Sequence, residues 1–225
     1  MAPGERFTDR REAGRRLGAA LRSHPLTQPV VLGLPRGGVP VADEVSRALG
    51  APLDVLVVRK VGVPWQPEVA MGAVGERGTA IWNADVRAHT RISDAELDAL
   101  ERRERAEVEA RVARFRAGRA PRAIEGRTAV VVDDGVATGA SARVACAMAR
   151  ELGAAHVILA TPVAPPEVID GFREADEVVC LASPRSFMAV GQHYVDFAQV
   201  SDEQVVAILQ AAPHADRETR RRSPG

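Results

Sequence analysis

The sequence predicts an α/β protein with a mainly parallel, doubly wound sheet of about five core strands. Short apolar runs rich in Val, Ile and Leu alternate with amphipathic helical segments along most of the chain. Such alternation implies a parallel sheet covered by helices on both faces. The composition agrees, because the 225 residues are 46% hydrophobic and 27% charged, as in ordinary globular proteins.

The first third of the chain predicts two strands and two helices. An Arg-rich amphipathic helix over Asp9–Arg22 makes residues 1–22 an N-terminal lead-in segment. The apolar run PVVLGL (29–34) predicts the first strand, and VADEVSRALG (41–50) predicts a helix that ends at a glycine. The second strand is predicted at LDVLVVRK (53–60).

The middle of the chain predicts a loop, a hairpin and a long helix. A Pro/Gly-rich loop is expected at VGVPWQP, followed by a hairpin whose turn lies at Glu76–Gly78. Ser93 and Glu96 have the spacing of a capping box, which opens a charged helix that continues to about Arg116.

The last third continues the alternation of strands and helices. Strands are predicted at 128–134, 156–163 and 177–183, and helices at 141–153, 165–175 and 201–212. The Arg-rich tail 213–225 lacks apolar periodicity and is predicted to be disordered. The main domain is therefore expected over residues 23–212.

Charge and hydropathy argue against several classes of function. The formal net charge is zero, so no overall field attracts nucleic acid or an anionic membrane. No apolar run approaches the roughly 20 residues of a membrane span, and residues 1–21 contain no signal-peptide core. Cys146 and Cys180 form no CxxC motif and are expected to be reduced thiols. These features predict a cytoplasmic protein.

The stretch VVVDDGVATGAS (130–141) carries the clearest chemical signal. Parallel sheets bind ligands at the carboxyl ends of their strands, where Asp133 and Asp134 lie. Strand alternation points two such side chains to opposite sides. The small residues that follow let backbone N–H groups approach an anion, and the next helix adds its positive end. This loop predicts a phosphate cradle.

The acidic pair narrows the choice of ligand. Ionised carboxylates only accept hydrogen bonds, which suits the two hydroxyl groups of a vicinal diol. A phosphate and a diol together describe ribose 5-phosphate. The loop has no Lys and no GxGxxG spacing, so it matches neither a nucleotide P-loop nor a dinucleotide fingerprint. The alternative is a strand end capped by two solvated acids and a Gly-rich turn.

The same stretch resembles the phosphoribosyl-diphosphate signature of the type I phosphoribosyltransferases. The resemblance implies that Asp133 and Asp134 bind the ribose hydroxyls. It also implies that Mg²⁺ is bound chiefly by diphosphate and ribose, with at most water-bridged contacts to these two acids. The implied ribose 5-phosphate site comprises the acids together with Gly135, Val136, Ala137, Thr138, Gly139, Ala140 and Ser141.

Two further segments match this family. LPRGGVP (34–40) lies where the family binds diphosphate, which implies that role for Arg36 and Gly37; the alternative is a tight strand-to-helix turn. Arg59 and Lys60 resemble a basic pair that neutralises diphosphate, and the alternative is two solvated charges. Lys60 is the only lysine in the chain, and an ammonium is not interchangeable with a guanidinium.

The identity of the base stays open. Some 6-oxopurine enzymes of the family carry a third carboxylate in the loop, where this chain has Ala137. Adenine-, xanthine- and orotate-like arrangements therefore all remain, with a purine-like base favoured. The resemblance also implies a small hood region that covers the base. Phe187, Tyr194 and Trp65 are candidates for stacking on a planar ring, although such residues are more often ordinary packing.

The resemblance implies a Mg²⁺-dependent enzyme that exchanges diphosphate and a nitrogenous base at C1 of ribose 5-phosphate. Its transition state would resemble an oxocarbenium ion. The candidate catalytic residues are Lys60, Arg36, Asp133 and Asp134. A homo-oligomer is expected, and nucleic acid and membrane partners are not. The alternative is a non-catalytic regulatory module that senses phosphoribosyl diphosphate or a nucleotide.

Overall fold

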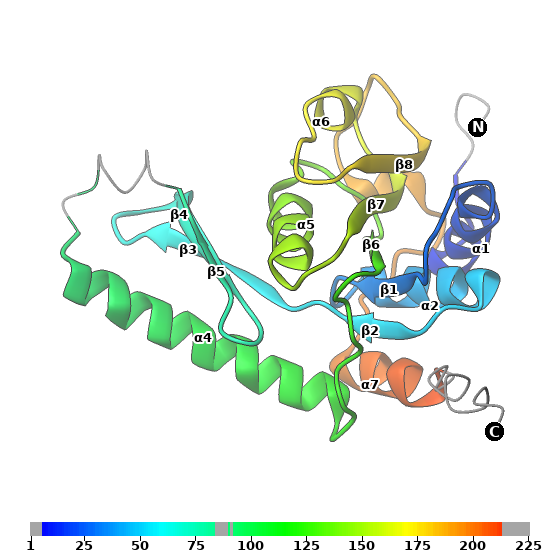
Figure 1. The fold of residues 1–225 in the computed structure, drawn as a ribbon. Helices are drawn as coiled ribbons and strands as arrows, with labels where there is room; N and C mark the ends of the chain where they lie inside the picture. The colour runs from blue at the N-terminus through cyan, green and yellow to red at the C-terminus, as the bar shows by residue number, and fades with distance from the viewer. Residues whose placement is uncertain (1–5, 84–89, 91, 213–225) are drawn as a thin grey trace, which may run out of the picture.

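A five-stranded parallel sheet forms the centre of the protein (Figure 1). The structure is a computed structural model that describes residues 6–83, 90 and 92–212. The strands lie in the order β2-β1-β6-β7-β8, so the predicted fold class is confirmed. Their bounds are β1 Val30–Gly33, β2 Leu53–Val55, β6 Thr128–Val132, β7 His156–Val163 and β8 Glu177–Ala182.

The two faces of this sheet bury two separate apolar cores, because successive side chains of a strand point to opposite faces. Val31 and Val130 belong to one core, and their neighbours Val30 and Val131 belong to the other. Every residue of β1 and β6 is buried. Strands covered on both faces explain why the sequence shows continuous apolar runs instead of alternation.

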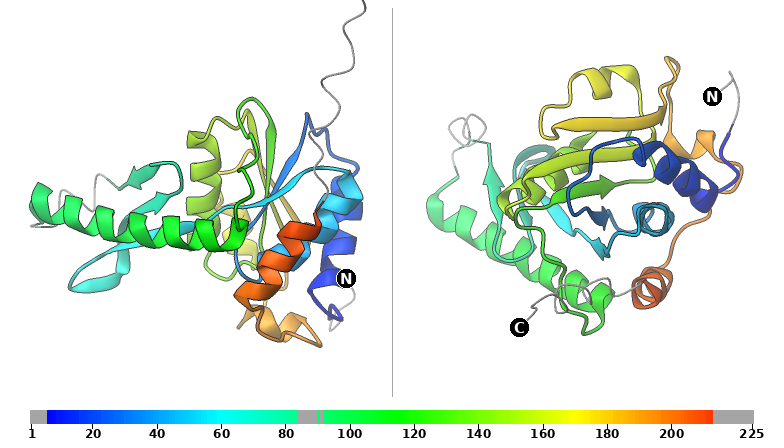
Figure 2. Two further views of the ribbon diagram at one scale, coloured as in Figure 1. Left: turned by 90° about the horizontal axis from the view of Figure 1, so that it is seen from below. Right: turned by 45° about the vertical axis from the view of Figure 1, so that its right-hand side comes forward.

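Helices cover both faces of the sheet (Figure 2). The first core is covered by α1 (Arg10–Leu21), α2 (Gly38–Leu49) and α7 (Asp202–Ala211), and the second by α5 (Ala140–Glu151) and the short α6 (Pro166–Asp170). Glycines bring α1 against α2, since a Cβ at Gly14 would lie 2.6 Å from the carbonyl oxygen of Val41. This contact fixes where the first turn of α1 lies.

An arm extends beyond the sheet on the β2 side (Figure 1). It consists of the long helix α4 (Asp94–Arg116) and an antiparallel sheet of β3 (Val58–Val63), β4 (Gln66–Gly75) and β5 (Ala80–Trp82). The predicted strand over residues 53–60 is therefore wrong as a single element. Its two halves lie in different sheets, a break that its continuous apolar pattern does not reveal.

Some of the other predicted elements are confirmed, and others differ in type or in length. The hairpin around Glu76–Gly78 is confirmed as the β4–β5 turn. The capping box predicted at Ser93 is present on α4, and the structure adds one at Ser201 on α7. The loop expected at VGVPWQP is mostly strand, and the helix expected over residues 165–175 ends at Asp170. The tail 213–225 lies outside the described residues.

A buried cluster of charges joins the arm to the main sheet. Arg116, at the end of α4, places Nε 3.0 Å from Oδ1 of Asp54 on β2 and a second nitrogen against Glu76. The backbone N–H of Arg122 donates to Asp54 at 2.9 Å. All three charged side chains of the ion pairs are at most 9% exposed. Buried charges need such mutual pairing, so the arm is electrostatically tied to β2.

The cysteines and the helices add two findings. Cys146 and Cys180 are both free thiols, and burial raises the pKa of each. Among the helices that the structure describes, none combines the length and apolar character that crossing a membrane requires.

Candidate active site

The carboxyl ends of β1 and β6 bring two sequence motifs together. These strands are hydrogen-bonded neighbours with Gly33 beside Val132, so the loops that follow them start side by side. A Cβ at Gly37 would lie 2.0 Å from Oδ2 of Asp134. A side chain at this position would displace the Asp134 carboxylate. The PRGG loop and the acidic pair, about 100 positions apart in sequence, therefore meet in one site.

Asp134 sits at the centre of this contact. Its carboxylate is 14% exposed and receives a hydrogen bond from Nε of Arg10 at 2.7 Å. The hydroxyl of Tyr194 donates to its backbone oxygen. Burial raises the pKa of Asp134, and the contact with Arg10 opposes that shift by favouring the ionised form.

Asp133 is the less readily ionised member of the pair. Its Oδ1 accepts the backbone N–H of Asp134 at 2.9 Å. Burial, with a second contribution from the charge of Asp134, raises its pKa from 3.8 to about 8. The two carboxyl groups are close enough to hydrogen-bond when one is protonated. Strand alternation does not separate them because β6 ends at Val132.

The loop after the acidic pair presents unsatisfied backbone donors. Within the described part of the chain, the N–H groups of Ala137, Thr138 and Gly139 donate to no protein acceptor, whereas that of Val136 donates to Val163 at 2.9 Å. Gly139 adopts φ 77°, a left-handed conformation that glycine tolerates, and caps α5. Ala137, Thr138 and Ser141 are exposed. The predicted phosphate-cradle residues thus form one turn at a helix N-terminus, with Gly135, Val136 and Gly139 buried beneath its exposed residues.

The PRGG loop forms a tight turn into α2. Its Pro35–Arg36 peptide bond is cis. A Cβ at Gly38 would lie 2.5 Å from the carbonyl oxygen of Val132, so this glycine lets the loop pack on β6. The Arg36 side chain is 36% exposed, with Nη1 3.6 Å from Oδ1 of Asp202 at the start of α7.

The basic pair lies on the arm, past the end of β2. Arg59 is held by α4, with Nε 2.6 Å from Oε2 of Glu104. Lys60 is exposed, and its ammonium makes no hydrogen bond or ion pair with the described residues. The structure therefore gives the two members of the predicted basic pair different surroundings.

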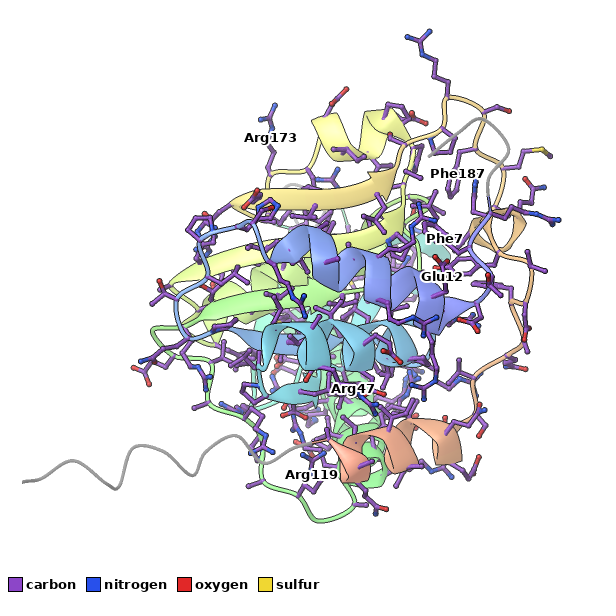
Figure 3. The ribbon with its side chains drawn as sticks, turned by 90° about the vertical axis from the view of Figure 1, so that its right-hand side faces the viewer. Phe7, Glu12, Arg47, Arg119, Arg173 and Phe187 are labelled. Carbon is purple, nitrogen blue, oxygen red and sulfur yellow. The ribbon has the colours of Figure 1, made fainter. Side chains whose placement is uncertain are left out.

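The three aromatic candidates lie in three different environments. Trp65 is at the β3–β4 turn and is 65% exposed. Tyr194 is 2% exposed and packs between Phe7 and Phe197. Phe187 stacks on His193 with ring centroids 5.3 Å apart, and Figure 3 shows it at the same end of the molecule as Phe7.

A cavity of about 360 Å³ opens at Asp134. Four of its lining residues are not among the predicted site residues, and three are. The lining comprises Arg10, Phe197, Gln199 and Val200 with Arg36, Gly37 and Asp134. No local signal marks Arg10, because it is one of several arginines on an amphipathic helix.

Comparison with known proteins identifies the family. The family model of the phosphoribosyl transferase domain matches residues 6–183. The chain belongs to the phosphoribosyl transferase domain family. The match includes α1, the PRGG loop and the whole acidic stretch, whereas the cavity residues Phe197, Gln199 and Val200 lie beyond it.

Similar proteins agree with this assignment. Proteins from two Mycobacterium tuberculosis strains, CDC 1551 / Oshkosh and ATCC 25618 / H37Rv, are named "Putative phosphoribosyl transferase" and are each 54% identical over 211 residues. The match covers 93% of this chain and 47% of theirs, so the chain spans about half the length of these relatives.

The fold also matches a solved structure closely. The crystal structure of TT1426 from Thermus thermophilus has 48% sequence identity and a TM-score of 0.84. The match covers 91% of this chain and 97% of that one. The phosphoribosyl transferase domain described above therefore has the sheet and hood arrangement of a known structure.

Proposed function

We propose that this chain is a phosphoribosyltransferase domain that exchanges diphosphate and a nitrogenous base at C1 of ribose 5-phosphate. One observation carries most of the weight: Asp134 lies against Gly37, so the acidic pair and the PRGG loop border one site. A substrate with a diol and a diphosphate needs acceptors and close backbone approach at the same place. Membership of the family supports the same chemistry.

The chain's own residues would act mainly by positioning the sugar. Asp133 and Asp134 accept hydrogen bonds from the ribose hydroxyls, and the N–H groups of residues 137–139, which have no protein acceptor among the described residues, bind the 5-phosphate. Positive charge develops on the sugar as diphosphate leaves, and Arg36 and Lys60 neutralise the negative charge on the leaving group. Rigid positioning and preorganised charges supply most of the acceleration in such a site.

The donor set of this site fits Mg²⁺, but it supplies few direct ligands. Mg²⁺ prefers carboxylate and phosphate oxygens and keeps several of its waters. Asp133 and Asp134 supply carboxylates, while the described residues contain no group of three or more His, Cys, Asp or Glu side chains arranged to hold a metal ion. The two aspartates would hold the ion through water and substrate oxygens, and the ion would supply charge neutralisation at the diphosphate.

A purine-like base is the acceptor that we favour. Ala137 replaces the loop carboxylate of some 6-oxopurine enzymes, so this position offers no base for proton transfer. Phe187 is our first candidate for the stacking residue because its ring is only partly buried, against 2% exposure for Tyr194.

A screen for base-dependent diphosphate release tests the proposal. The protein is incubated with Mg²⁺, phosphoribosyl diphosphate and one of a panel of purines and pyrimidines. We expect release with at least one base, and a fall of roughly 10²-fold in Asp134→Asn because charge-assisted bonds to the diol become neutral ones. Release with no base by a protein that still binds phosphoribosyl diphosphate would contradict the enzymatic function.

A regulatory module is the second candidate, and it is favoured by the ion pairs that two of the predicted diphosphate-binding residues already make. Glu104 holds Arg59 and Asp202 approaches Arg36, so both guanidinium groups already face carboxylates. A sensor of nucleotide needs no free cation for a departing diphosphate.

Lys60→Met separates the two candidates. In an enzyme, Lys60 matters most when charge accumulates on diphosphate, so we expect turnover to fall by roughly 10²-fold. Mononucleotide affinity should barely change. The matched control is Arg102→Met, which removes an exposed cation from α4. Steady-state kinetics and nucleotide titration measure both effects. Intact turnover with impaired nucleotide binding would support the sensor.

A further inference from the structure

Arg10 contacts the acidic pair from outside every motif described above. It is the first residue of α1, and its Nε lies 2.7 Å from Oδ2 of Asp134. The two side chains are 11% and 14% exposed. In the described part of the chain, no other cation pairs with Asp133 or Asp134.

The same guanidinium holds the segment that covers the site. Nη1 of Arg10 donates to the backbone oxygen of Ala198 at 2.7 Å. The ring of Phe197 lies 3.9 Å from the guanidinium carbon, which is the geometry of a cation–π contact. Arg10 thus joins an aspartate of the site to residues 197–198 through three separate contacts.

Other bonds hold this covering segment, residues 194–200, against the start of the chain. The backbone N–H of Phe7 donates to His193 at 2.8 Å, and that of Val195 donates to Phe7 at 2.8 Å. The N–H of Asp196 donates to Thr8 at 2.9 Å. The hydroxyl of Tyr194 reaches the backbone oxygen of Asp134. The covering segment, residues 7–10 and the acidic pair therefore form one connected unit.

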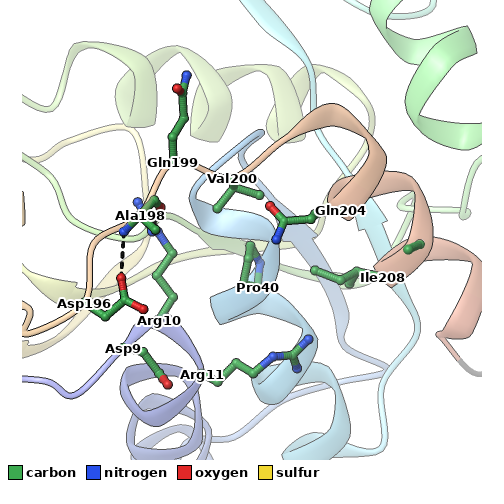
Figure 4. A pocket seen from close by; sticks show the side chains of 11 residues that line it. Asp9, Arg10, Arg11, Pro40, Asp196, Ala198, Gln199, Val200, Gln204 and Ile208 are labelled. Carbon is green, nitrogen blue, oxygen red and sulfur yellow. Dashed lines mark hydrogen bonds between the residues drawn. The ribbon is translucent and has the colours of Figure 1, made fainter.

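Arg10 also lines two cavities. One is the cavity at Asp134, and the other, of about 350 Å³, lies between α1, α2 and α7. Arg10, Gln199 and Val200 line both. Figure 4 shows Arg10 directed toward Ala198, whereas Arg11 extends away toward the other side of the cavity. Only Arg10 of these two arginines is aimed at the acidic pair.

We propose that Arg10 is a positioning residue that orients the Asp134 carboxylate toward a sugar diol and locks the covering segment over it. This inference rests on the proposed function. A carboxylate has about four acceptor positions on two oxygens, so Arg10 fixes the group without exhausting its acceptor capacity. A planar guanidinium can bond Asp134 and Ala198 at once while its face stacks on Phe197, which an ammonium cannot reproduce.

The test measures how much the diol adds to binding. Ribose 5-phosphate and methyl phosphate share a phosphate monoester, but only the sugar carries a diol. Isothermal calorimetry gives the ratio of the two affinities for the wild-type chain and for Arg10→Gln. We expect the wild-type ratio to fall by about 10-fold in the variant, the range for a lost charge-assisted bond. Methyl phosphate affinity should not change.

Three variants distinguish positioning from a general structural effect. Arg15→Gln removes an exposed positive charge from the same helix and should leave the ratio unchanged. Arg10→Lys keeps the charge but not the planar fork, so it should recover only part of the ratio. Phe197→Leu removes the stacked ring and leaves Arg10 in place, and it should lower the ratio by a smaller factor. Phe197→Leu also serves if Arg10→Gln does not fold.

The possible outcomes separate this inference from the proposed function. Equal losses for both ligands in Arg10→Gln would mean a structural role and would overturn the inference alone. Tighter ribose 5-phosphate binding in that variant would show that Arg10 competes with the sugar, and would also overturn it. A wild-type chain that prefers neither ligand would overturn the diol site itself, and with it the proposed function.

Discussion

At the scale of single residues, the acidic pair is an asymmetric unit. Asp134 has a cation at 2.7 Å, and Asp133 has none of its own among the described residues. Two neighbouring acids in a buried site cannot both ionise easily, so one of them keeps its proton to higher pH. Arg10 decides which one, because it favours the charged form of Asp134. The sequence places the two acids together but does not contain this distinction.

The raised pKa of Asp133 predicts how stability depends on pH. In the unfolded chain this group loses its proton near 3.8, whereas in the folded chain it does so near 8. Between these values the folded state binds more protons, so the free energy of unfolding should fall as the pH rises. We expect a decrease of at least about 1 kcal/mol between pH 5 and pH 8 that Asp133→Asn does not share.

Urea denaturation at several pH values measures this difference. Asp133→Asn is neutral throughout, so it should approach the wild-type stability near pH 5 and exceed it near pH 8. Parallel curves for the two proteins would show that Asp133 ionises normally in the folded chain.

At the scale of elements, the turn between β6 and α5 depends on one backbone conformation. Gly139 has φ 77°, and a Cβ there would lie 3.1 Å from Val168 on α6. A side chain would therefore press on the packing of α6 and not fill the cradle directly. The glycine is needed because the turn that exposes the loop N–H groups requires a left-handed residue.

Gly139→Val should weaken phosphate binding by distorting that turn. We expect at least a 10-fold loss in affinity for ribose 5-phosphate, because a β-branched residue at positive φ costs about 1–2 kcal/mol or more. Gly126→Val is the matched control, since Gly126 has φ 71° but precedes β6, at the opposite end of the strand. Calorimetry with circular dichroism measures binding and folding. Equal binding by both variants would place the phosphate elsewhere.

At the scale of the whole molecule, the arm and the sheet are held together by charges. Arg116 compensates Asp54 and Glu76, which are 5% and 4% exposed. The proposed role of Lys60 depends on this junction, because Lys60 lies on β3 and β3 belongs to the arm. A loose arm would leave the ammonium without a fixed place relative to the sheet.

Arg116→Met should therefore destabilise the whole domain. Removing one partner leaves two buried carboxylates without compensation, which typically costs about 3–5 kcal/mol. Arg114→Met on the same helix is the control, because its ion pair with Asp202 involves a side chain that is 66% exposed. Exposed pairs contribute about 0–1 kcal/mol. Similar free energies of unfolding for the two variants would mean that the junction is held by apolar packing.

The sequence by itself determined the strand–helix alternation, the caps and the local chemistry of residues 133–141. Each depends on neighbours along the chain: apolar period, capping-box spacing and a turn of small residues are local properties. Only the tertiary structure decided that LDVLVVRK divides between two sheets, that Glu104 takes Arg59 while Lys60 stays exposed, and that Arg10 reaches Asp134. The two ion pairs join residues that are 45 and 124 positions apart. The division of LDVLVVRK places neighbouring residues in different sheets. The physical cause of these arrangements is the packing of α1 on α2 and of α4 on the antiparallel sheet of the arm, which no local pattern encodes.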